Sequence, residues 1–329
     1  MAHQRSPWRP PMRDGVSASC VALPQPTTQP SSQASWSLLL DFLAERLNAV
    51  SRDDWHARMQ RGEVLSEHGQ ALGPHTPYAA LAHQQPQARV FYYRSIEAEP
   101  TIPFEAQVLF DDEHLLVADK PHFLPVLPSG RFVRETLLVR LKAHTGLDDL
   151  SPIHRIDRET AGLVVFSKRA QDRHAYQHLF VSQDVHKTYL AVAPWREHLQ
   201  HPVDAPLIHR SRMEADTQFF RQREVTGIPN SETRVAMLAH WHISQHLALY
   251  QLTPRSGKTH QLRVHMNALG APMMGDQFYP EVKHAAGVDD FSEPLQLLAQ
   301  SIAFTDPVTG QARSFESQRV LSLHAERIS

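Results

Sequence analysis

Strand-like and helix-like segments in the second two thirds of the chain do not alternate regularly, and this order most constrains the fold. Runs rich in β-branched and aromatic residues predict strands at 106–110, 115–118, 162–166, 188–193, 234–243 and 247–252. Helical periodicity covers 136–145, 170–181 and 259–269. A doubly wound parallel sheet requires strands and helices in regular alternation. We therefore predict an α+β fold over residues 101–329, with a mixed, mainly antiparallel β-sheet, flanking helices and a central cleft.

The first hundred residues divide into two parts. Residues 1–36 are rich in Pro, Ser, Thr and Gln, a composition that predicts a disordered tail. Residues 37–100 predict a small α/β module, in which Ser37 caps a helix over 38–47 and Ser51 with Asp54 opens a second helix. Two short strands within 63–72 and another at 89–94 complete this module.

Composition excludes several classes of protein. The formal net charge is −2, so bulk charge does not predict a nucleic-acid partner. A single cysteine, Cys20, rules out a disulfide within the chain. No apolar run is long enough to span a membrane, and no secretory signal is evident near the N-terminus. We expect a cytoplasmic protein without a membrane association, and a monomer.

The segment HRIDRETAGLVVFSK at 154–168 carries the most informative chemistry. Asp157 stands between Arg155 and Arg158, immediately before a predicted buried strand. A carboxylate held there can stay ionised and act as a nucleophile or stabilise a cation, and the arginines suit a polyanionic substrate. The alternative is a solvated salt-bridge cluster at the start of a strand.

Two later segments carry further candidates. In VHKTYLAVA at 185–193, Tyr189 offers a flat ring and a hydroxyl, although a half-buried sheet tyrosine is the alternative. In LTPRSGKTHQLRVHMNALG at 252–270, a loop with Arg255 and Lys258 leads into a helix that we expect Thr259 to cap. Residues 251–266 contain three cations and no acid, which predicts a phosphate site.

The order of these segments resembles that of the RluA-type pseudouridine synthases. Three further segments belong to the same pattern: HLLVADKPHFLPVLPSG at 114–130, GAPMMGDQFY at 270–279 and a closing strand pair within 297–316. The resemblance implies that Asp157 is the essential catalytic residue and that Arg263 pairs with it. It also implies that Tyr189 stacks on the target base and acts as a general base. The chain departs from the family pattern in having D-K-P for N-K-P and Ala161 for a common serine.

The resemblance further implies an isomerase that converts uridine in structured RNA to pseudouridine, without a cofactor or a metal ion. Ribosomal RNA is the expected substrate, and transfer RNA is the alternative. Residues implied to bind RNA are Arg155, Arg158, Arg255, Lys258 and His260. The module at 37–100 resembles a small RNA-binding module, but its six arginines face eight acidic residues. A module that only packs on the catalytic part is the alternative.

The same residues also bear on other functions. His174 and His178 have the i,i+4 spacing of metal ligands on a helix, but residue 175 is alanine where a metalloprotease has its acid. No G-x-S-x-G motif for serine hydrolysis occurs. A glycosidic hydrolase would need a second carboxylate, for which Asp276 is the candidate. A non-catalytic RNA-binding protein on the same fold is disfavoured because Asp157 is present.

Overall fold

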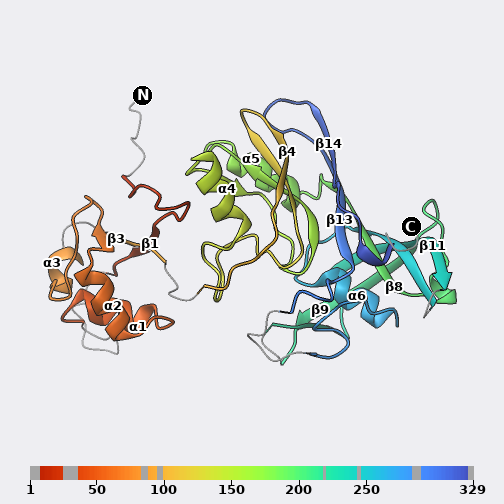
Figure 1. Ribbon diagram of the computed structural model, residues 1–329, viewed down its shortest axis with the longest axis horizontal. Coiled ribbons are helices and arrows are strands. Elements are labelled where there is room, and N and C mark those ends of the chain that lie inside the picture. The colour runs from red at the N-terminus through yellow and green to blue at the C-terminus, as the bar shows by residue number, and fades with distance from the viewer. Residues whose placement is uncertain are drawn as a thin grey trace. The chain divides into compact units, whose positions relative to one another are not determined.

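The computed structural model describes residues 8–24, 36–82, 88–94, 99–217, 220–242, 246–283 and 290–324. The chain forms two compact units (Figure 1). The first comprises Met1–Glu99 and Val139–Asp148, and the second comprises Pro100–Leu138 and Asp149–Ser329. No helix among these described ranges is long and apolar enough to cross a membrane.

The first unit contains a three-stranded antiparallel sheet in the order β1-β3-β2, together with short helices. Its elements are β1 (Ser19–Ala22), α1 (Leu39–Arg46), α2 (Arg52–Gln60), β2 (Val64–Ser66), α3 (Tyr78–Ala82), β3 (Arg89–Tyr92) and most of α4 (Leu137–Thr145). The core of the unit forms where the apolar stripe of α1 meets Trp55 of α2 and Val64 of β2. Burial of these side chains removes apolar surface from water and stabilises the small unit.

Disorder was the wrong prediction for residues 8–24. Strand β1 pairs with β3, and Val16 and Leu23 beside it are buried. The backbone N–H of Leu23 also donates to the carbonyl of Ala88 over 2.8 Å. The Pro- and Gln-rich composition averaged over 1–36 concealed the short apolar pattern around Val21. Residues 1–7 and 25–35 of the predicted tail lie outside the described residues.

One of the two helix caps predicted for the first unit is found in the structure, and the other is shifted by one residue. Ser51 accepts a hydrogen bond from the Asp54 backbone N–H over 3.1 Å, so the predicted second cap is confirmed. The cap of α1 is Leu38 instead of Ser37, because the Asp41 carboxylate accepts the Leu38 backbone N–H. Of the two strands predicted within 63–72, only β2 forms, and Ala71 makes an isolated bridge to Leu65.

The second unit contains an 11-stranded sheet among its described residues. The central path is β10-β9-β11-β12-β8-β13-β7-β5-β4, with β14 paired to β13 and β6 paired to β7. Its strands are β4 (Gln107–Asp111), β5 (Leu115–Lys120), β6 (Ser151–Pro152), β7 (Ala161–Ser167), β8 (His186–Pro194), β9 (Leu207–Ala215), β10 (Gln222–Val225), β11 (Ser231–His242), β12 (His246–Pro254), β13 (Leu297–Thr305) and β14 (Ala312–Glu316). Among the strands of the described residues, only β7 and β13 pair in parallel, so the predicted mixed, mainly antiparallel sheet is confirmed.

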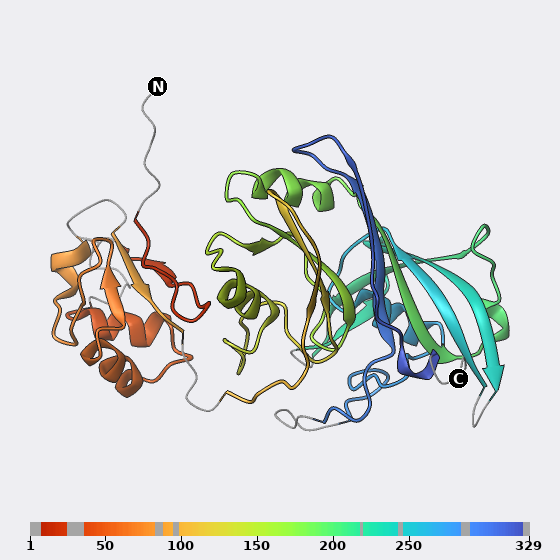
Figure 2. The same ribbon diagram turned by 45° about the horizontal axis from the view of Figure 1, so that its top comes forward.

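Helices α6 (Gln261–Ala268) and α5 (Arg173–Val181) pack against the sheet of the second unit. Leu262 and Met266 of α6 pack on Ala191 of β8 and Tyr250 of β12. Strands β12, β8 and β13 run side by side through the middle of the sheet (Figure 2, green to blue). Helix α5 packs Tyr176 onto β5 and β7, and a short 3-10 helix, η1 (Glu197–Leu199), follows β8.

The parallel contact between β7 and β13 requires a glycine. Gly162 adopts a φ of 108°, and a Cβ there would lie 2.3 Å from the carbonyl oxygen of Ala299. Only glycine tolerates both this backbone conformation and this close approach. The result is that β7, which follows the segment containing Asp157, lies directly beside β13.

Candidate active site

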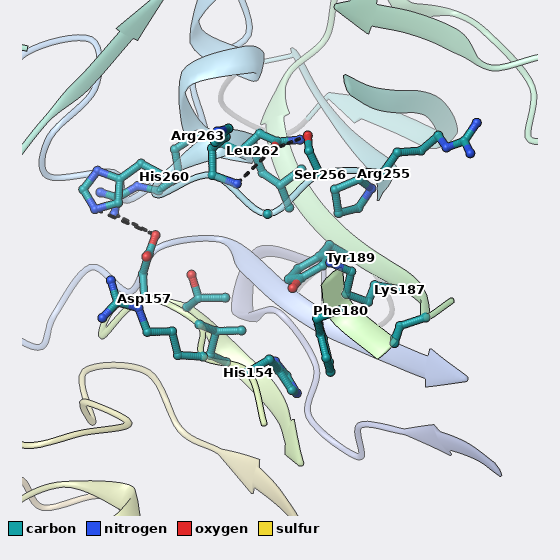
Figure 3. A pocket seen from close by; sticks show the side chains of 18 of the residues that line it. His154, Asp157, Phe180, Lys187, Tyr189, Arg255, Ser256, His260, Leu262 and Arg263 are labelled. Atoms are coloured by element: carbon teal, nitrogen blue, oxygen red, sulfur yellow. Dashed lines mark hydrogen bonds and ion pairs between the residues drawn. The ribbon is translucent and has the colours of Figure 1, made fainter. Parts of the chain in front are cut away.

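A cavity of about 540 Å³ opens in the second unit at one end of the central strands. The segment before β7, strand β8, the loop after β12 and helix α6 contribute its walls (Figure 3). The lining residues are Ile153, His154, Arg155, Ile156, Asp157, Thr160, Phe180, Gln183, Val185, Lys187, Tyr189, Asn230, Pro254, Arg255, Ser256, Gly257, Lys258, His260, Gln261, Leu262, Arg263 and Leu297. The volume is in the range of sites that enclose a small organic group.

Asp157 reaches the cavity from the turn between β6 and β7. Its carboxylate is 27% exposed, and Oδ2 lies 3.5 Å from a guanidinium nitrogen of Arg263 and 3.9 Å from Nε2 of His260. Figure 3 shows Asp157 on one side of the cavity, with His260 and Arg263 on the opposite side. The carboxylate is thus accessible to a bound molecule and stands beside a fixed positive charge.

Arg263 is not the exposed helix arginine that the sequence left open, because its side chain is only 1% exposed. Its guanidinium donates to both oxygens of Asp276, at 2.9 and 2.7 Å, and lies 4.8 Å from the centre of the Phe278 ring. Burial acts to lower the pKa of Arg263, but the hydrogen-bonded Asp276 and the nearby Asp157 hold it above its ordinary value. Arg263 therefore remains charged and points one nitrogen at Asp157.

Asp276, the candidate second carboxylate of a hydrolase, is buried behind Arg263 and not exposed to the cavity. It is 1% exposed, and one of its oxygens also accepts the backbone N–H groups of Phe278 and Tyr279, at 2.8 and 3.1 Å. It does not line the cavity. Its hydrogen bonds hold Arg263 and the following turn in place, so it is not placed to activate a water molecule.

Tyr189 lies in the middle of the sheet and lines the cavity together with Lys187, as the strand periodicity predicts. On its two sides it pairs with Leu252 of β12 and Ala299 of β13, which fixes its backbone. Burial, and to a smaller extent the charge of Asp157, raises the pKa of the Tyr189 hydroxyl. The group is therefore a neutral phenol across the neutral pH range.

His154 has a supporting position at the edge of the cavity. Its Nε2 accepts the backbone N–H of Val165 over 3.1 Å, and its ring stacks on Phe180 with centres 4.9 Å apart. Burial, assisted by the charge of Lys187, lowers the pKa of His154 to about 3. The imidazole is neutral and fixes the segment that carries Asp157 to strand β7.

The two arginines beside Asp157 differ. Arg155 is exposed and lines the cavity, whereas Arg158 does not line it. The Arg158 Nε donates to the carbonyl of Phe123 over 3.0 Å, and its guanidinium lies 5.1 Å from the Phe132 ring centre. Arg155 is therefore the better placed of the two to meet a ligand in the cavity.

The loop after β12 is held by a residue that sequence reasoning missed. Gln261 accepts hydrogen bonds from the Ser256 hydroxyl, at 2.7 Å, and from the Lys258 backbone N–H, at 3.1 Å. The predicted cap at Thr259 is wrong: α6 begins at Gln261, and its N-cap is His260 in a left-handed conformation. The position of Gln261 within the THQLR segment was the available signal, because a glutamine can satisfy donors and acceptors at once. The loop presents Arg255, Lys258 and His260 to the cavity.

Lys120, in the D-K-P segment, is a second residue whose role the sequence did not reveal. Its side chain is fully buried, and Nζ donates to the carbonyls of Pro121, at 2.9 Å, and Arg158, at 3.0 Å. Burial lowers the pKa of Lys120 to about 7, although Glu159 and Asp157 oppose this shift. Lys120 thus supports the backbone of the turn that follows Asp157.

The histidine pair with metal-ligand spacing, His174 and His178, does not form a metal site among the described residues. His174 and His178 on α5 are both exposed, with ring centres 6.4 Å apart and no acidic partner grouped with them. The ligand-type side chains that do gather are His209, Glu224 and His265, from three different elements.

Known proteins resemble this chain in sequence and in fold. The family described as "RNA pseudouridylate synthase" matches residues 114–268. The dual-specificity RNA pseudouridine synthase RluA of Haemophilus influenzae is 31% identical over 240 residues, which cover 68% of this chain and 97% of that protein. The ribosomal large subunit pseudouridine synthase D of Zymomonas mobilis is 28% identical, with 74% and 73% covered. The structure of human RNA pseudouridylate synthase domain containing 1 matches with a TM-score of 0.51 at 18% identity, over 70% of this chain and 97% of that one.

Proposed function

The chain belongs to the RluA family of RNA pseudouridine synthases and is an isomerase, and from this premise we propose that Asp157, Arg263 and Tyr189 carry the reaction on a uridine of ribosomal RNA. The observation that carries the proposal is the position of Asp157. It is the one carboxylate among the residues that line the cavity, and it stands 3.5 Å from the buried Arg263. The finer assignments below rest on this geometry and on the chemistry of the side chains.

The reaction exchanges one bond of ribose C1′ for another. The bond from C1′ to N1 of uracil breaks, a bond from C1′ to C5 forms, and the proton on C5 is lost while N1 gains one. As the first bond breaks, positive charge develops at C1′, and the carboxylate of Asp157 either attacks that carbon or stabilises it. Because the substrate and product contain the same atoms, no cofactor is needed to balance the reaction.

Arg263 positions Asp157 for this step. Its guanidinium is locked by Asp276 and the Phe278 ring, so it needs no reorganisation when a nucleotide enters. Preorganised charge of this kind holds the carboxylate ionised and aimed at C1′. A detached uracil must rotate without leaving, and a cavity of about 540 Å³ can enclose a nucleoside while it does so.

Tyr189 faces the same cavity and provides the ring on which the base stacks. Its raised pKa keeps the hydroxyl in the neutral phenol form, which is a poor base by itself. It can take the C5 proton only while passing its own proton onward, to water or to Asp157. The proposed role is therefore a stacking surface with a proton relay through the hydroxyl.

RNA would reach the cavity through a rim of cations. Three exposed cations, Arg155, Arg255 and Lys258, line the cavity together with His260, whose pKa is lowered by burial. Such groups bind phosphates on either side of a nucleotide that is turned out of its helix or loop. The role proposed for Arg155, two residues before Asp157, is to fill the space that the extruded base leaves.

Ribosomal RNA is proposed as the substrate class, and transfer RNA is the alternative, since one relative is named for the large ribosomal subunit and another for dual specificity. The test is to map pseudouridine in total RNA from cells that carry the gene, lack it, or carry only Asp157→Asn. We expect at least one ribosomal position to be modified in the first cells and unmodified in the other two. If pseudouridine disappears only from transfer RNA, transfer RNA replaces ribosomal RNA as the proposed substrate. If pseudouridine disappears from no position in any RNA, the proposed function is contradicted.

A further inference from the structure

Three metal-ligand side chains meet in the second unit outside the cavity. His209 lies on β9, Glu224 on β10 and His265 on α6. Nε2 of His209 is 2.7 Å from Oε1 of Glu224, and the same oxygen is 3.9 Å from Nε2 of His265. One ligand atom from each residue falls within 4.8 Å of the others, and none of the three residues lines the cavity.

The deepest of the three is held in the orientation that a metal ligand needs. His265 is completely buried, and its Nδ1 lies 2.9 Å from the hydroxyl of Thr233. A histidine ligand usually has its second nitrogen fixed by such an outer hydrogen bond, which sets the tautomer and the ring direction.

The ligand set selects the kind of ion. Two imidazole nitrogens and one carboxylate oxygen suit Zn²⁺ and neighbouring transition metals, whereas Mg²⁺ and Ca²⁺ prefer oxygen ligands. Bonds of about 2.0–2.2 Å place tetrahedral ligand atoms roughly 3.4 Å apart. The two separations in the structure, 2.7 and 3.9 Å, lie on either side of that value, so side-chain shifts below about 1 Å would complete the geometry.

We propose that His209, Glu224 and His265 form a binding site for one divalent transition metal ion, with Zn²⁺ as the best-matched ion. The hydroxyls of Ser211 and Ser231 lie 3.1 and 3.0 Å from Nε2 of His265, the atom that would bind the ion, so they must release this nitrogen when the ion enters. The ion has a structural role. It ties the β9–β10 pair at the end of the sheet to α6, the helix that also carries Arg263.

The experiment uses the full chain, freed of metal with a chelator and titrated with Co²⁺, whose visible absorption reports its ligands, and then with Zn²⁺ in competition. The test variants are His209→Gln and Glu224→Gln, which alter half-buried side chains and leave the buried His265 in place. The matched control is His178→Gln, which removes one member of the exposed pair on α5, the competing i,i+4 site.

We expect one equivalent of Co²⁺ per chain in the unsubstituted protein and in His178→Gln, and an affinity weaker by about tenfold or more in both test variants. Zn²⁺ should raise the melting temperature of the unsubstituted protein and of His178→Gln, but not of the test variants. Equal affinity in all four proteins, or binding lost only in His178→Gln, would overturn the proposal and leave a hydrogen-bonded network of His209, Glu224 and His265. Near-identical circular dichroism spectra of the four metal-free proteins establish that each is folded.

Discussion

Asp276 determines how Arg263 meets Asp157, although Asp276 does not line the cavity. Two guanidinium nitrogens of Arg263 are used by Asp276, and the third is left toward Asp157. A lysine in place of Arg263 could not make both contacts, because an ammonium group lacks the planar fork. The Asp157 carboxylate is thus positioned through the buried Arg263–Asp276 pair, which it does not itself belong to.

Asp276→Asn should lower both stability and turnover. The amide cannot match the charge of Arg263, and breaking a buried ion pair costs about 3–5 kcal/mol. Urea unfolding should show this loss, and kcat should fall more than KM rises because Arg263 is no longer fixed. Glu214→Gln, which breaks the exposed pair with Arg212, is the control and should cost less than about 1 kcal/mol. Stability and kcat equal to those of the control would show that Asp276 does not position Arg263.

Tyr189→Phe should keep the stacking surface and lose the relay. If the hydroxyl transfers the C5 proton, turnover should fall by ~10²-fold or more while RNA affinity changes little. Because the pKa of Tyr189 is raised, the unsubstituted enzyme should show no gain in rate near the ordinary tyrosine pKa. Tyr250→Phe, which removes a buried hydroxyl outside the cavity, is the control. An unchanged rate in Tyr189→Phe would leave this residue a stacking role only.

At the scale of elements, the site forms where chain segments far apart in sequence end at the same place. Strand β8 brings Tyr189, the turn before β7 brings Asp157, and the first turn of α6 brings Arg263. The end of β5 supports the turn that contains Asp157, because Lys120 donates a hydrogen bond to the carbonyl of Arg158. A short displacement of any one of these elements would separate the three side chains.

Lys120 makes stability depend on pH in a defined direction. Its pKa is about 7 in the folded protein and 10.5 in the unfolded chain, so between these values the unfolded chain binds more protons. Stability should therefore rise with pH through this window, relative to Lys120→Met, by up to about 1.4 kcal/mol per pH unit. Urea unfolding of both proteins at pH 7, 8 and 9 measures the difference. The exposed Lys283→Met should show no such trend, and a parallel pH dependence of Lys120→Met and the unsubstituted protein would contradict a largely neutral Lys120.

Local patterns were sufficient to predict the elements that carry strong periodicity. The alternation around Tyr189 and the apolar stripe of α6 predicted β8 and α6 to within a few residues. Strands β9 and β10 were not predicted, because their exposed, charged residues lack a clear apolar alternation. Strand β1 was missed because its stability comes from pairing with β3, about 70 positions later.

Local sequence patterns also could not predict which side chains contact one another in the site. The proximity of Asp157 and Arg263 could be anticipated only through the family resemblance, since 106 positions separate them. The Asp276 pair, the Gln261 contacts and the group of His209, Glu224 and His265 depend on tertiary packing that no local spacing encodes. The His174–His178 pair, which local spacing did suggest, has no acid beside it among the described residues.

At the scale of the whole molecule, the chain has a first unit whose role in RNA binding is a proposal. The module at 37–100 is acidic overall, with six arginines and eight acidic residues, so any contact with phosphates would be modest. The structure adds β1 and its flanking residues to this unit, and helix α4 contributes Lys142, which donates to the Ser17 hydroxyl over 2.7 Å. Residues 8–24 are thus part of a packed unit.

Deleting residues 1–24 should destabilise the first unit, although the composition predicted a disordered tail over residues 1–36. The deletion removes the pairing partner of β3 and uncovers the core around Leu39. Amide hydrogen exchange at Val90–Tyr92 should accelerate by about tenfold or more, whereas exchange in β7 and β8 of the second unit should stay as it was. The slope of RNA affinity against salt, measured on the same protein, reports any phosphate contacts that the deletion removes. Unchanged exchange at Val90–Tyr92 would mean that β1 does not hold the unit together.

The most direct test of the central claim is tritium release from RNA labelled at uridine C5, compared between the unsubstituted enzyme and Asp157→Asn. Asparagine keeps the shape of the side chain but removes the charge that acts at C1′, so turnover should be abolished while RNA affinity and melting temperature stay close to those of the unsubstituted enzyme. The exposed Asp204→Asn is the control and should release tritium at the full rate. Release by Asp157→Asn within about tenfold of the unsubstituted enzyme would contradict the assignment of Asp157 as the catalytic carboxylate.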